Sequence, residues 1–126
     1  ERGLARRRQA LGAAYVDRRL AENNPLTVDF QQLISRYAWD EIWNRPGLDA
    51  RTRRLLVLAI TASLGRWEEF DLHMDSGLSA ELQLTELKEL LMQTAVYAGV
   101  PAANTGFAHL ERNLAQRAQA RESKRP

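Results

Sequence analysis

Apolar side chains recur at intervals of three and four residues along most of this chain, which is the pattern of helices with one buried face. The pattern predicts a first helix over residues 4–21, which the run Asn-Asn-Pro then ends. A second helix is predicted over residues 29–43, and an Asn-Arg-Pro-Gly turn follows it.

The third predicted helix begins at an Asp49 N-cap and closes at Gly65. It contains the apolar run 55–60, so it is expected to be buried on all sides. A short buried strand is the alternative for that run, although the flanking residues extend it to helical length.

Three more helices complete the prediction. The fourth covers residues 67–76 and ends at Gly77, and the fifth runs from a Thr85 cap to Ala98. The residues of the fifth that are expected to face inward are Leu87, Leu90, Leu91, Thr94 and Ala98. The sixth begins near residue 102 and frays in the C-terminal tail. The sequence therefore predicts an all-α, single-domain bundle of about six helices over residues 1–126, with a basic tail from about residue 117.

The composition narrows the function classes. The absence of cysteine excludes disulfide scaffolds, cysteine-bound zinc and dithiol redox chemistry. The longest apolar run, residues 55–60, is far short of a membrane span, and no signal-peptide pattern is found. We therefore expect a soluble cytoplasmic protein without a membrane partner. The chain opens at Glu1 rather than at a methionine, which leaves room for native residues before it.

The net charge of +2 is unevenly distributed. Residues 24–115 hold 8 basic and 12 acidic residues, whereas the two ends hold 10 basic and 4 acidic ones. We interpret the basic ends as solvated segments and expect no nucleic-acid partner. Nucleic-acid binding through residues 6–8 and 124–125 is the alternative, but no aromatic residues are interleaved there to stack on bases.

Glu69 and His73 are the strongest candidates for chemistry, because four residues on a helix place them side by side. Arg66 lies within about 60° of both, and all three border the apolar stripe. An ordinary exposed pair is the alternative, since such pairs are common and contribute only ~0.3–0.5 kcal/mol. No third ligand is evident, so no metal site is predicted. His109 is expected to be structural or exposed at a rim.

Arginines cluster in the sequence around the third predicted helix, at positions 45, 51, 53, 54 and 66. Some of them are expected to be solvated. An arginine on an otherwise apolar helix must find a carboxylate, from the protein or from a ligand, because guanidinium does not lose its proton. Trp39 and Trp43 are expected to pack in the core or at a subunit contact, and lining a substrate site is the alternative.

Five segments of the chain form a recognisable set. They are residues 1–8, Trp39-x-x-x-Trp43-x-Arg-Pro-Gly-Leu48, Arg53-x-Leu-Leu56, Glu69-x-x-Leu-His73 and Tyr97-Ala-Gly-Val-Pro-Ala-Ala-Asn104. The Arg-Pro-Gly-Leu turn and the Gly-Val-Pro-Ala-Ala-Asn block are the specific parts. Together, over about residues 2–113, the segments resemble the carboxymuconolactone decarboxylase family.

The wider superfamily includes alkylhydroperoxidase-D-like enzymes with a Cys-x-x-Cys-x-x-x-His active site. Aligned on His73, the cysteine positions are Arg66 and Glu69 here, which excludes a dithiol peroxidase and favours the decarboxylase branch. The resemblance implies an alkylhydroperoxidase-D-like all-α fold, a homohexamer and a step in bacterial protocatechuate breakdown, the β-ketoadipate pathway. We expect the second and sixth helices to supply much of the subunit contact.

The implied reaction is the decarboxylation of 4-carboxymuconolactone to 3-oxoadipate enol-lactone by a carboxy-lyase. When carbon dioxide leaves, its electron pair spreads onto the lactone carbonyl, so the substrate is its own electron sink and no cofactor is needed. His73, oriented by Glu69, is then the expected proton donor, because imidazole titrates near neutral pH.

The resemblance also implies residues that contact the small-molecule substrate. Arg45 and Arg53 belong to the matched motifs and are expected to bind its carboxylates. Arg51, Arg66 and Trp39 are further candidates. Two alternatives remain open: another lyase or isomerase of the same fold acting on a small lactone or acid, and a non-catalytic helical homo-oligomer used for binding.

Overall fold

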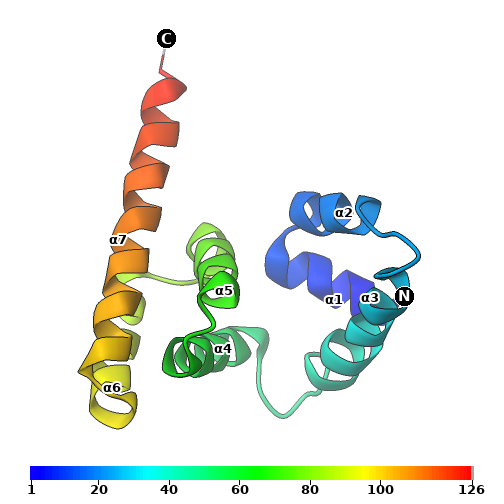
Figure 1. Ribbon diagram of the computed structural model, residues 1–126, viewed down its shortest axis with the longest axis horizontal. Coiled ribbons are helices and arrows are strands. Elements are labelled where there is room, and N and C mark those ends of the chain that lie inside the picture. The colour runs from blue at the N-terminus through cyan, green and yellow to red at the C-terminus, as the bar shows by residue number, and fades with distance from the viewer. Residues whose placement is uncertain (126) are drawn as a thin grey trace. The chain divides into compact units, whose positions relative to one another are not determined.

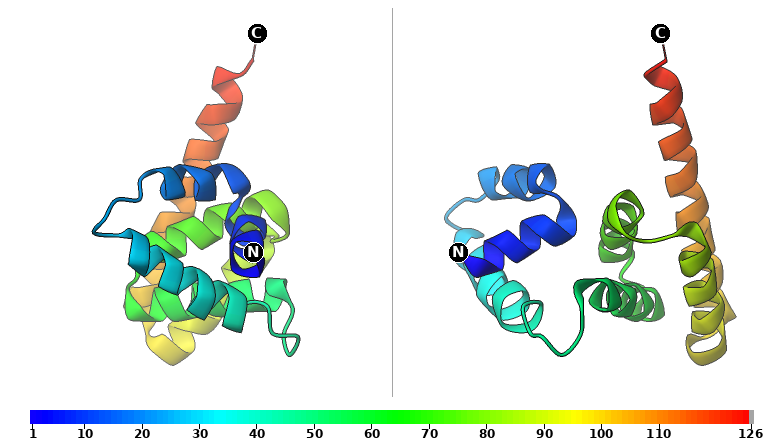
Figure 2. Two further views of the ribbon diagram at one scale, coloured as in Figure 1. Left: turned by 90° about the vertical axis from the view of Figure 1, so that its right-hand side faces the viewer. Right: turned by 180° about the vertical axis from the view of Figure 1, so that it is seen from behind.

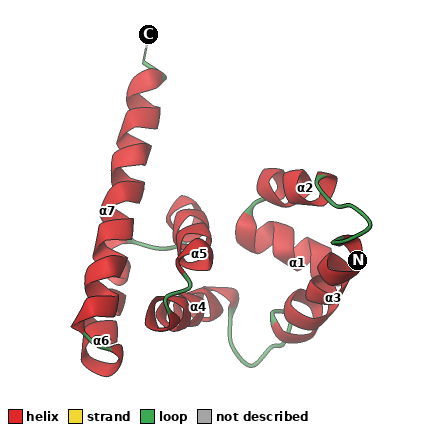
Figure 3. Cartoon of the chain, in the orientation of Figure 1, coloured by secondary structure: helices red, strands yellow, loops and turns green. Residues whose placement is uncertain are grey.

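The computed structural model describes residues 1–125, and every regular element in that range is helical (Figure 1, Figure 3). The elements are α1 (Arg2–Leu11), α2 (Ala13–Ala21), α3 (Val28–Ile34), the π-helical η1 (Ser35–Ile42), α4 (Ala50–Leu64), α5 (Trp67–Ala80), α6 (Leu84–Ala98) and α7 (Val100–Ser123). The all-α prediction is confirmed, although these residues form seven α-helices and one π-helical segment instead of about six helices. No helix in this range is both long and apolar enough to cross a membrane.

Contacts within the chain group the helices into two compact units. The first unit is Glu1–Arg53, and the second begins at Arg54. The division falls inside α4, so the first turn of that helix belongs to the first unit. The single-domain organisation of the whole chain stays a prediction.

The helix predicted over residues 4–21 is two helices, because Gly12 interrupts it with φ 93 and ψ 133. α1 packs against η1. Gly3 lies so close to Ser35 there that a β-carbon would collide with the Ser35 carbonyl. The expectation of solvated basic ends is wrong for Arg7, which is only 6% exposed. Burial lowers the pKa of its guanidinium.

The second predicted helix is confirmed, since α3 and η1 run without a break from residue 28 to residue 42. The winding of η1 is wider than that of an α-helix. At its end the N–H of Trp43 donates to the carbonyl of Ala38, five residues back, at 2.9 Å. Trp39 is buried, and its ring lies against that of Trp43 with centroids 4.8 Å apart. Trp39 therefore packs in the core of the first unit.

α4 begins at the cap that the sequence predicts, because the N–H of Thr52 donates to the carboxylate of Asp49 at 2.7 Å. The expected burial of this helix on all sides is wrong. Its buried residues form a single stripe: Arg54, Leu58 and Ala62. Leu56 and Ile60 are 46% and 53% exposed. The reason is that the core of the second unit packs against one face of α4.

The core of the second unit joins α4, α5, α6 and α7. Its buried side chains are Leu58, Ala62, Phe70, Met74, Leu82, Leu87, Leu91 and Leu110. A β-carbon on Gly106 would lie 2.5 Å from the Leu91 side chain, so α6 and α7 pack closely. The C-terminal part of α7 extends beyond α6 in both views of Figure 2. The predicted fraying of this tail is wrong as far as Ser123, where the helix ends.

α6 begins at a different cap from the one predicted. Gln83, not Thr85, is the N-cap, and its backbone N–H donates to the Glu86 carboxylate at 2.8 Å. The Gln83 side chain reciprocally caps the first turn, which completes a capping box. Of the residues expected inward, Leu87, Leu91 and Thr94 are buried. The expectation is wrong for Ala98, which is exposed at the helix end beside Gly99.

Candidate active site

α5 buries four residues at helical spacing, which places them on one face. They are Phe70, His73, Met74 and Gly77. The imidazole of His73 is consequently 7% exposed and shares its helix face with the apolar Phe70 and Met74. It therefore belongs to the buried stripe itself and not to its border.

The polar group that α4 brings to this imidazole is Arg54. Its Nη1 lies 3.5 Å from Nδ1 of His73, and its Nε donates to a carboxylate oxygen of Glu81 at 3.0 Å. The Arg54 side chain is 3% exposed, whereas Glu81 is 29% exposed. The sequence argument that an arginine on this helix must find a carboxylate is thus confirmed for Arg54.

Gly77 shapes the space around Arg54. The predicted helix end at Gly77 is wrong, because α5 continues to Ala80 and Gly77 is buried inside it. A β-carbon at position 77 would lie 2.6 Å from Leu82 and 3.4 Å from Cδ of Arg54. The N–H groups of Glu81 and Leu82 both donate to the Gly77 carbonyl, at 2.9 and 2.8 Å. This turn carries Glu81 back toward Arg54.

The electrostatics of the pair favour an uncharged imidazole. Burial, and then the positive charge of Arg54, lower the pKa of His73 from 6.5 to about 4. Arg54 cannot relieve the repulsion by losing its own proton. At neutral pH His73 is therefore a neutral imidazole, which can donate one hydrogen bond and accept another.

The other candidates on α5 lie at its exposed beginning. Arg66 is the N-cap residue, and its backbone N–H donates to the Thr61 carbonyl at 2.8 Å. The side chains of Arg66 and Glu69 are exposed, about two turns and one turn before the buried His73 respectively. The orientation of His73 by Glu69 stays a prediction.

The remaining candidates belong to the first unit. Nη2 of Arg53 donates to the backbone carbonyl of Arg45 at 3.1 Å, which brings these two predicted substrate contacts together. Nε of Arg53 is buried without a hydrogen-bond partner among residues 1–125. Arg45 is exposed, Arg51 is half-buried on the first turn of α4, and Trp39 is buried against Trp43.

Arg54 and Glu81 are the residues that sequence reasoning did not place in the site. The signal for Arg54 was present, because Arg54, Leu58 and Ala62 are spaced by four and form one stripe. That spacing separates Arg54 from Arg51 and Arg53 on the same helix. Glu81 carries no comparable signal, since it is 27 residues away in sequence and meets Arg54 only in the fold.

His109 has a structural setting. Its Nδ1 lies 2.7 Å from a carboxylate oxygen of Asp71, and its ring stacks on Trp67 with centroids 4.8 Å apart. One turn further, Asn113 donates to Asp75 at 3.1 Å, so the two contacts tie α7 to α5. This agrees with the structural role expected for His109. Within residues 1–125, no three His, Asp or Glu side chains gather as a metal site requires.

Comparisons with known proteins place this geometry in context. The sequence profile of the carboxymuconolactone decarboxylase family matches residues 29–112. A 4-carboxymuconolactone decarboxylase of Acinetobacter baylyi is 41% identical over 107 residues, which cover 85% of this chain and 80% of that protein. The nitrosuccinic acid decarboxylase npaB of Metarhizium robertsii is 31% identical over 126 residues, which cover 100% of this chain and 88% of that protein. Arg54, His73 and Glu81 all lie inside the matched range.

Proposed function

The chain belongs to the carboxymuconolactone decarboxylase family, and we propose that it is a carboxy-lyase that converts 4-carboxymuconolactone to 3-oxoadipate enol-lactone. The observation that carries this proposal is the buried contact between Arg54 and His73, inside the range that the family profile matches. A fixed cation beside a neutral imidazole, in surroundings with little water, suits a reaction in which negative charge moves onto a substrate oxygen.

The substrate supplies the electron sink for this reaction. Its departing carboxylate sits on the γ carbon of an unsaturated lactone. The electron pair left behind by carbon dioxide spreads through the ring double bond to the lactone carbonyl, which gives a dienolate. The carbon next to that carbonyl then takes up a proton and the enol-lactone results. The protein must bind two carboxylates and stabilise one developing oxyanion, and we propose that no cofactor takes part.

The residues of the first unit are proposed to bind the carboxylates. Arg45 and Arg53 are already joined by a hydrogen bond, and the unpartnered Nε of Arg53 is a donor that a carboxylate would satisfy. Arg51 and Arg66 are the next candidates, and Trp39 is a candidate for the wall of the site. Glu69 and His73 are the proposed catalytic residues.

The general-acid role predicted for His73 needs a protonated imidazole near neutral pH. A pKa of about 4 leaves that form scarce at pH 7. The same pKa leaves the imidazole N–H available as a hydrogen-bond donor. The proposed activity therefore does not depend on His73 being the acid.

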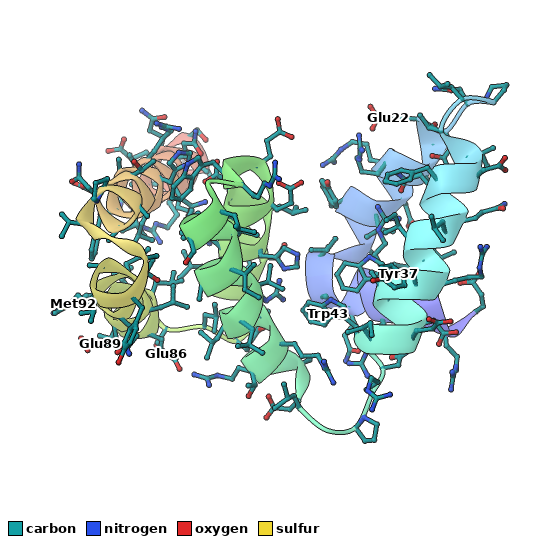
Figure 4. All side chains as sticks on the ribbon, turned by 60° about the horizontal axis from the view of Figure 1, so that its bottom comes forward. Glu22, Tyr37, Trp43, Glu86, Glu89 and Met92 are labelled. Atoms are coloured by element: carbon teal, nitrogen blue, oxygen red, sulfur yellow. The ribbon has the colours of Figure 1, made fainter. Side chains whose placement is uncertain are left out.

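The pathway, assembly and location are parts of the same proposal. We propose a homohexamer in the cytoplasm that serves protocatechuate breakdown. Large apolar side chains that the chain leaves exposed support assembly, including Val96 at 75% and Tyr97 at 83%. Tyr37 on η1 and Met92 on α6, both labelled in Figure 4, are 61% and 51% exposed.

A second candidate substrate is 2-nitrosuccinate, because the nitrosuccinic acid decarboxylase matches this chain over its whole length. Both substrates carry the departing carboxylate where an oxygen acceptor can take the electron pair, a lactone carbonyl in one and a nitro group in the other. Measuring carbon dioxide release from each compound separates them. We expect faster release from 4-carboxymuconolactone. Release from neither would contradict the proposed activity and favour a non-catalytic binding protein.

A further inference from the structure

We infer that His73 acts as a neutral hydrogen-bond donor, through Nε2, to the oxygen that gains charge as carbon dioxide leaves, and that Arg54 and Glu81 are positioning residues that hold it in that tautomer. The inference rests on the proposed decarboxylation. It names the group that stabilises the oxyanion, and it gives His73 a role different from that of a proton donor to carbon.

The tautomer follows from the chemistry of the Arg54 side chain. A guanidinium carries only donors, and Nη1 of Arg54 lies 3.5 Å from Nδ1 of His73. If Nδ1 carried a proton, two N–H groups would point at each other in a buried place. Nδ1 must therefore present its lone pair, and the single proton of the neutral ring sits on Nε2.

The position of Arg54 is itself fixed. Its Nε donates to Glu81 at 3.0 Å, and a charge-assisted hydrogen bond of this kind resists rearrangement. Gly77 leaves the space that the arginine stem occupies, with Cδ at 3.4 Å from where a β-carbon would be. Glu81 thus fixes Arg54, and Arg54 in turn orients His73. Glu81 and Arg54 act on the reaction only through His73.

Burial and the positive charge of Arg54 both favour the neutral form of the ring. Arg54 reaches the ring from α4. The carboxylate of Glu81, which follows α5, accepts a hydrogen bond from Arg54. Glu69, on the same helix as His73, is exposed and solvated. With a pKa of about 4, the ring stays neutral through the physiological range.

The reaction step balances with water as the proton source. The bond between the γ carbon and the carboxylate breaks, carbon dioxide leaves, and the electron pair reaches the lactone oxygen. That oxygen accepts a hydrogen bond from Nε2 of His73, which keeps its proton. A water molecule then protonates the carbon next to the carbonyl and leaves hydroxide, so one solvent proton is consumed for each turnover.

The tautomer is testable without any substrate. In protein labelled with 15N-histidine, long-range proton–nitrogen spectra distinguish a ring protonated on Nε2 from one protonated on Nδ1 or on both. The chain has two histidines, and an H109Q variant leaves one set of signals to assign to His73. We expect His73 to be neutral at pH 7 with its proton on Nε2. A proton on Nδ1, or on both nitrogens, overturns the inference.

A variant of Arg54 tests the positioning. In R54M, which keeps an unbranched apolar stem and removes the guanidinium and its charge, we expect both tautomers of His73 to appear and its pKa to rise. An unchanged spectrum shows that Arg54 does not set the tautomer. If R54M fails to fold, the spectrum of the wild-type protein still decides the assignment, and E81Q, which keeps the volume of the carboxylate, provides a second variant.

A matched pair at position 73 tests the role in the reaction. Glutamine can place an amide N–H near the position of Nε2, whereas asparagine is too short to do so. Losing one oxyanion donor typically lowers kcat by about 10²–10³-fold, so we expect that loss in H73N and a loss at least tenfold smaller in H73Q. Equal losses in the two variants would overturn the donor role and favour a general acid.

The two failures are distinguishable. Absence of carbon dioxide release from either substrate, with the Nε2 proton observed, contradicts the proposed function and leaves the tautomer established. Release of carbon dioxide from a protein whose His73 carries its proton on Nδ1 contradicts this inference and leaves the proposed function standing.

Discussion

Arg54 and Glu81 are joined by a hydrogen-bonded ion pair of 3.0 Å, in which the arginine is 3% exposed and the carboxylate 29% exposed. The pair connects α4 to the turn after α5 across 27 residues of sequence. The pair holds the positive charge of Arg54 beside His73. The carboxylate also offsets the desolvation free energy of burying that charge.

Removing the carboxylate should therefore destabilise the protein. We expect E81A to lower the free energy of unfolding by about 3 kcal/mol, because the guanidinium of Arg54 stays buried without its partner. Urea denaturation followed by circular dichroism measures this loss. E81Q is the matched control, since its amide oxygen can still accept from Nε, and it should lose less. A midpoint for E81A equal to that of the wild type would show that the pair does not stabilise the fold.

The lowered pKa of His73 makes stability depend on pH. Between a folded pKa of about 4 and a reference value of 6.5, the unfolded chain binds a proton that the folded protein does not. Stability should thus be complete above about pH 6.5 and fall toward pH 4, by up to about 3 kcal/mol. Urea titrations across this range, compared with H73Q, isolate the contribution. The same slope in both proteins would assign the effect to other groups.

Gly77 should not tolerate a larger residue. Alanine gains about 1 kcal/mol of helix propensity over glycine, but its β-carbon would lie 2.6 Å from the buried Leu82. We expect G77A to lose about 1–3 kcal/mol net, as overpacked cores do. G47A is the control, because no atom lies within 4 Å of a β-carbon at that position. Thermal unfolding of the two variants gives the comparison, and a more stable G77A would mean that Leu82 moves aside freely.

Arg45 and Arg53 should act in substrate binding. Lysine cannot reproduce the guanidinium fork, so we expect R53K and R45K each to raise KM about tenfold, or ~1.4 kcal/mol. Folding should be unaffected by circular dichroism. R36K, at an exposed position elsewhere in the first unit, is the control. Unchanged kinetics in both variants would move the carboxylate contact to Arg51 or Arg66.

The exposed apolar side chains predict self-association. Multi-angle light scattering should give a mass of six chains of 14.3 kDa each. Y97E places a charge on a residue that is 83% exposed in the single chain, so it should leave a folded monomer unchanged and disrupt an assembly that covers it. A single-chain mass for the wild type at micromolar concentration would contradict the hexamer.

The helices were predictable because their cause is local. Apolar spacing and the Asp49 cap specify where α4 begins, and both are visible in the sequence. The glycines show where local reasoning fails. Gly12 breaks a helix through its positive φ, whereas Gly77 continues one and makes room for two side chains. Nothing in the residue type distinguishes these uses, since the second depends on atoms from another helix.

The site was predictable only in part, for the same reason. The sequence marks His73 as a candidate, but its burial, its neutral form and its contact with Arg54 arise from packing between α4 and α5. The four-residue spacing that pointed to Glu69 describes one helix in isolation. Spacing along a helix predicts which side chains are neighbours on the surface of that helix. The partner of a buried side chain, in contrast, comes from a different helix that packs against it.

The wide winding of η1 also constrains how the chain can change in length. A π-helical turn holds one residue more than an α-helical turn, as the bond from Trp43 to Ala38 shows. Deleting one residue from η1 would let the wide turn close as a regular α-helical turn, and the shorter segment would still span about the same rotation. The residues beyond the deletion would therefore stay near their original faces relative to α3. In this segment a deletion is easier to accommodate than in a regular α-helix, where it turns the following residues onto a different face.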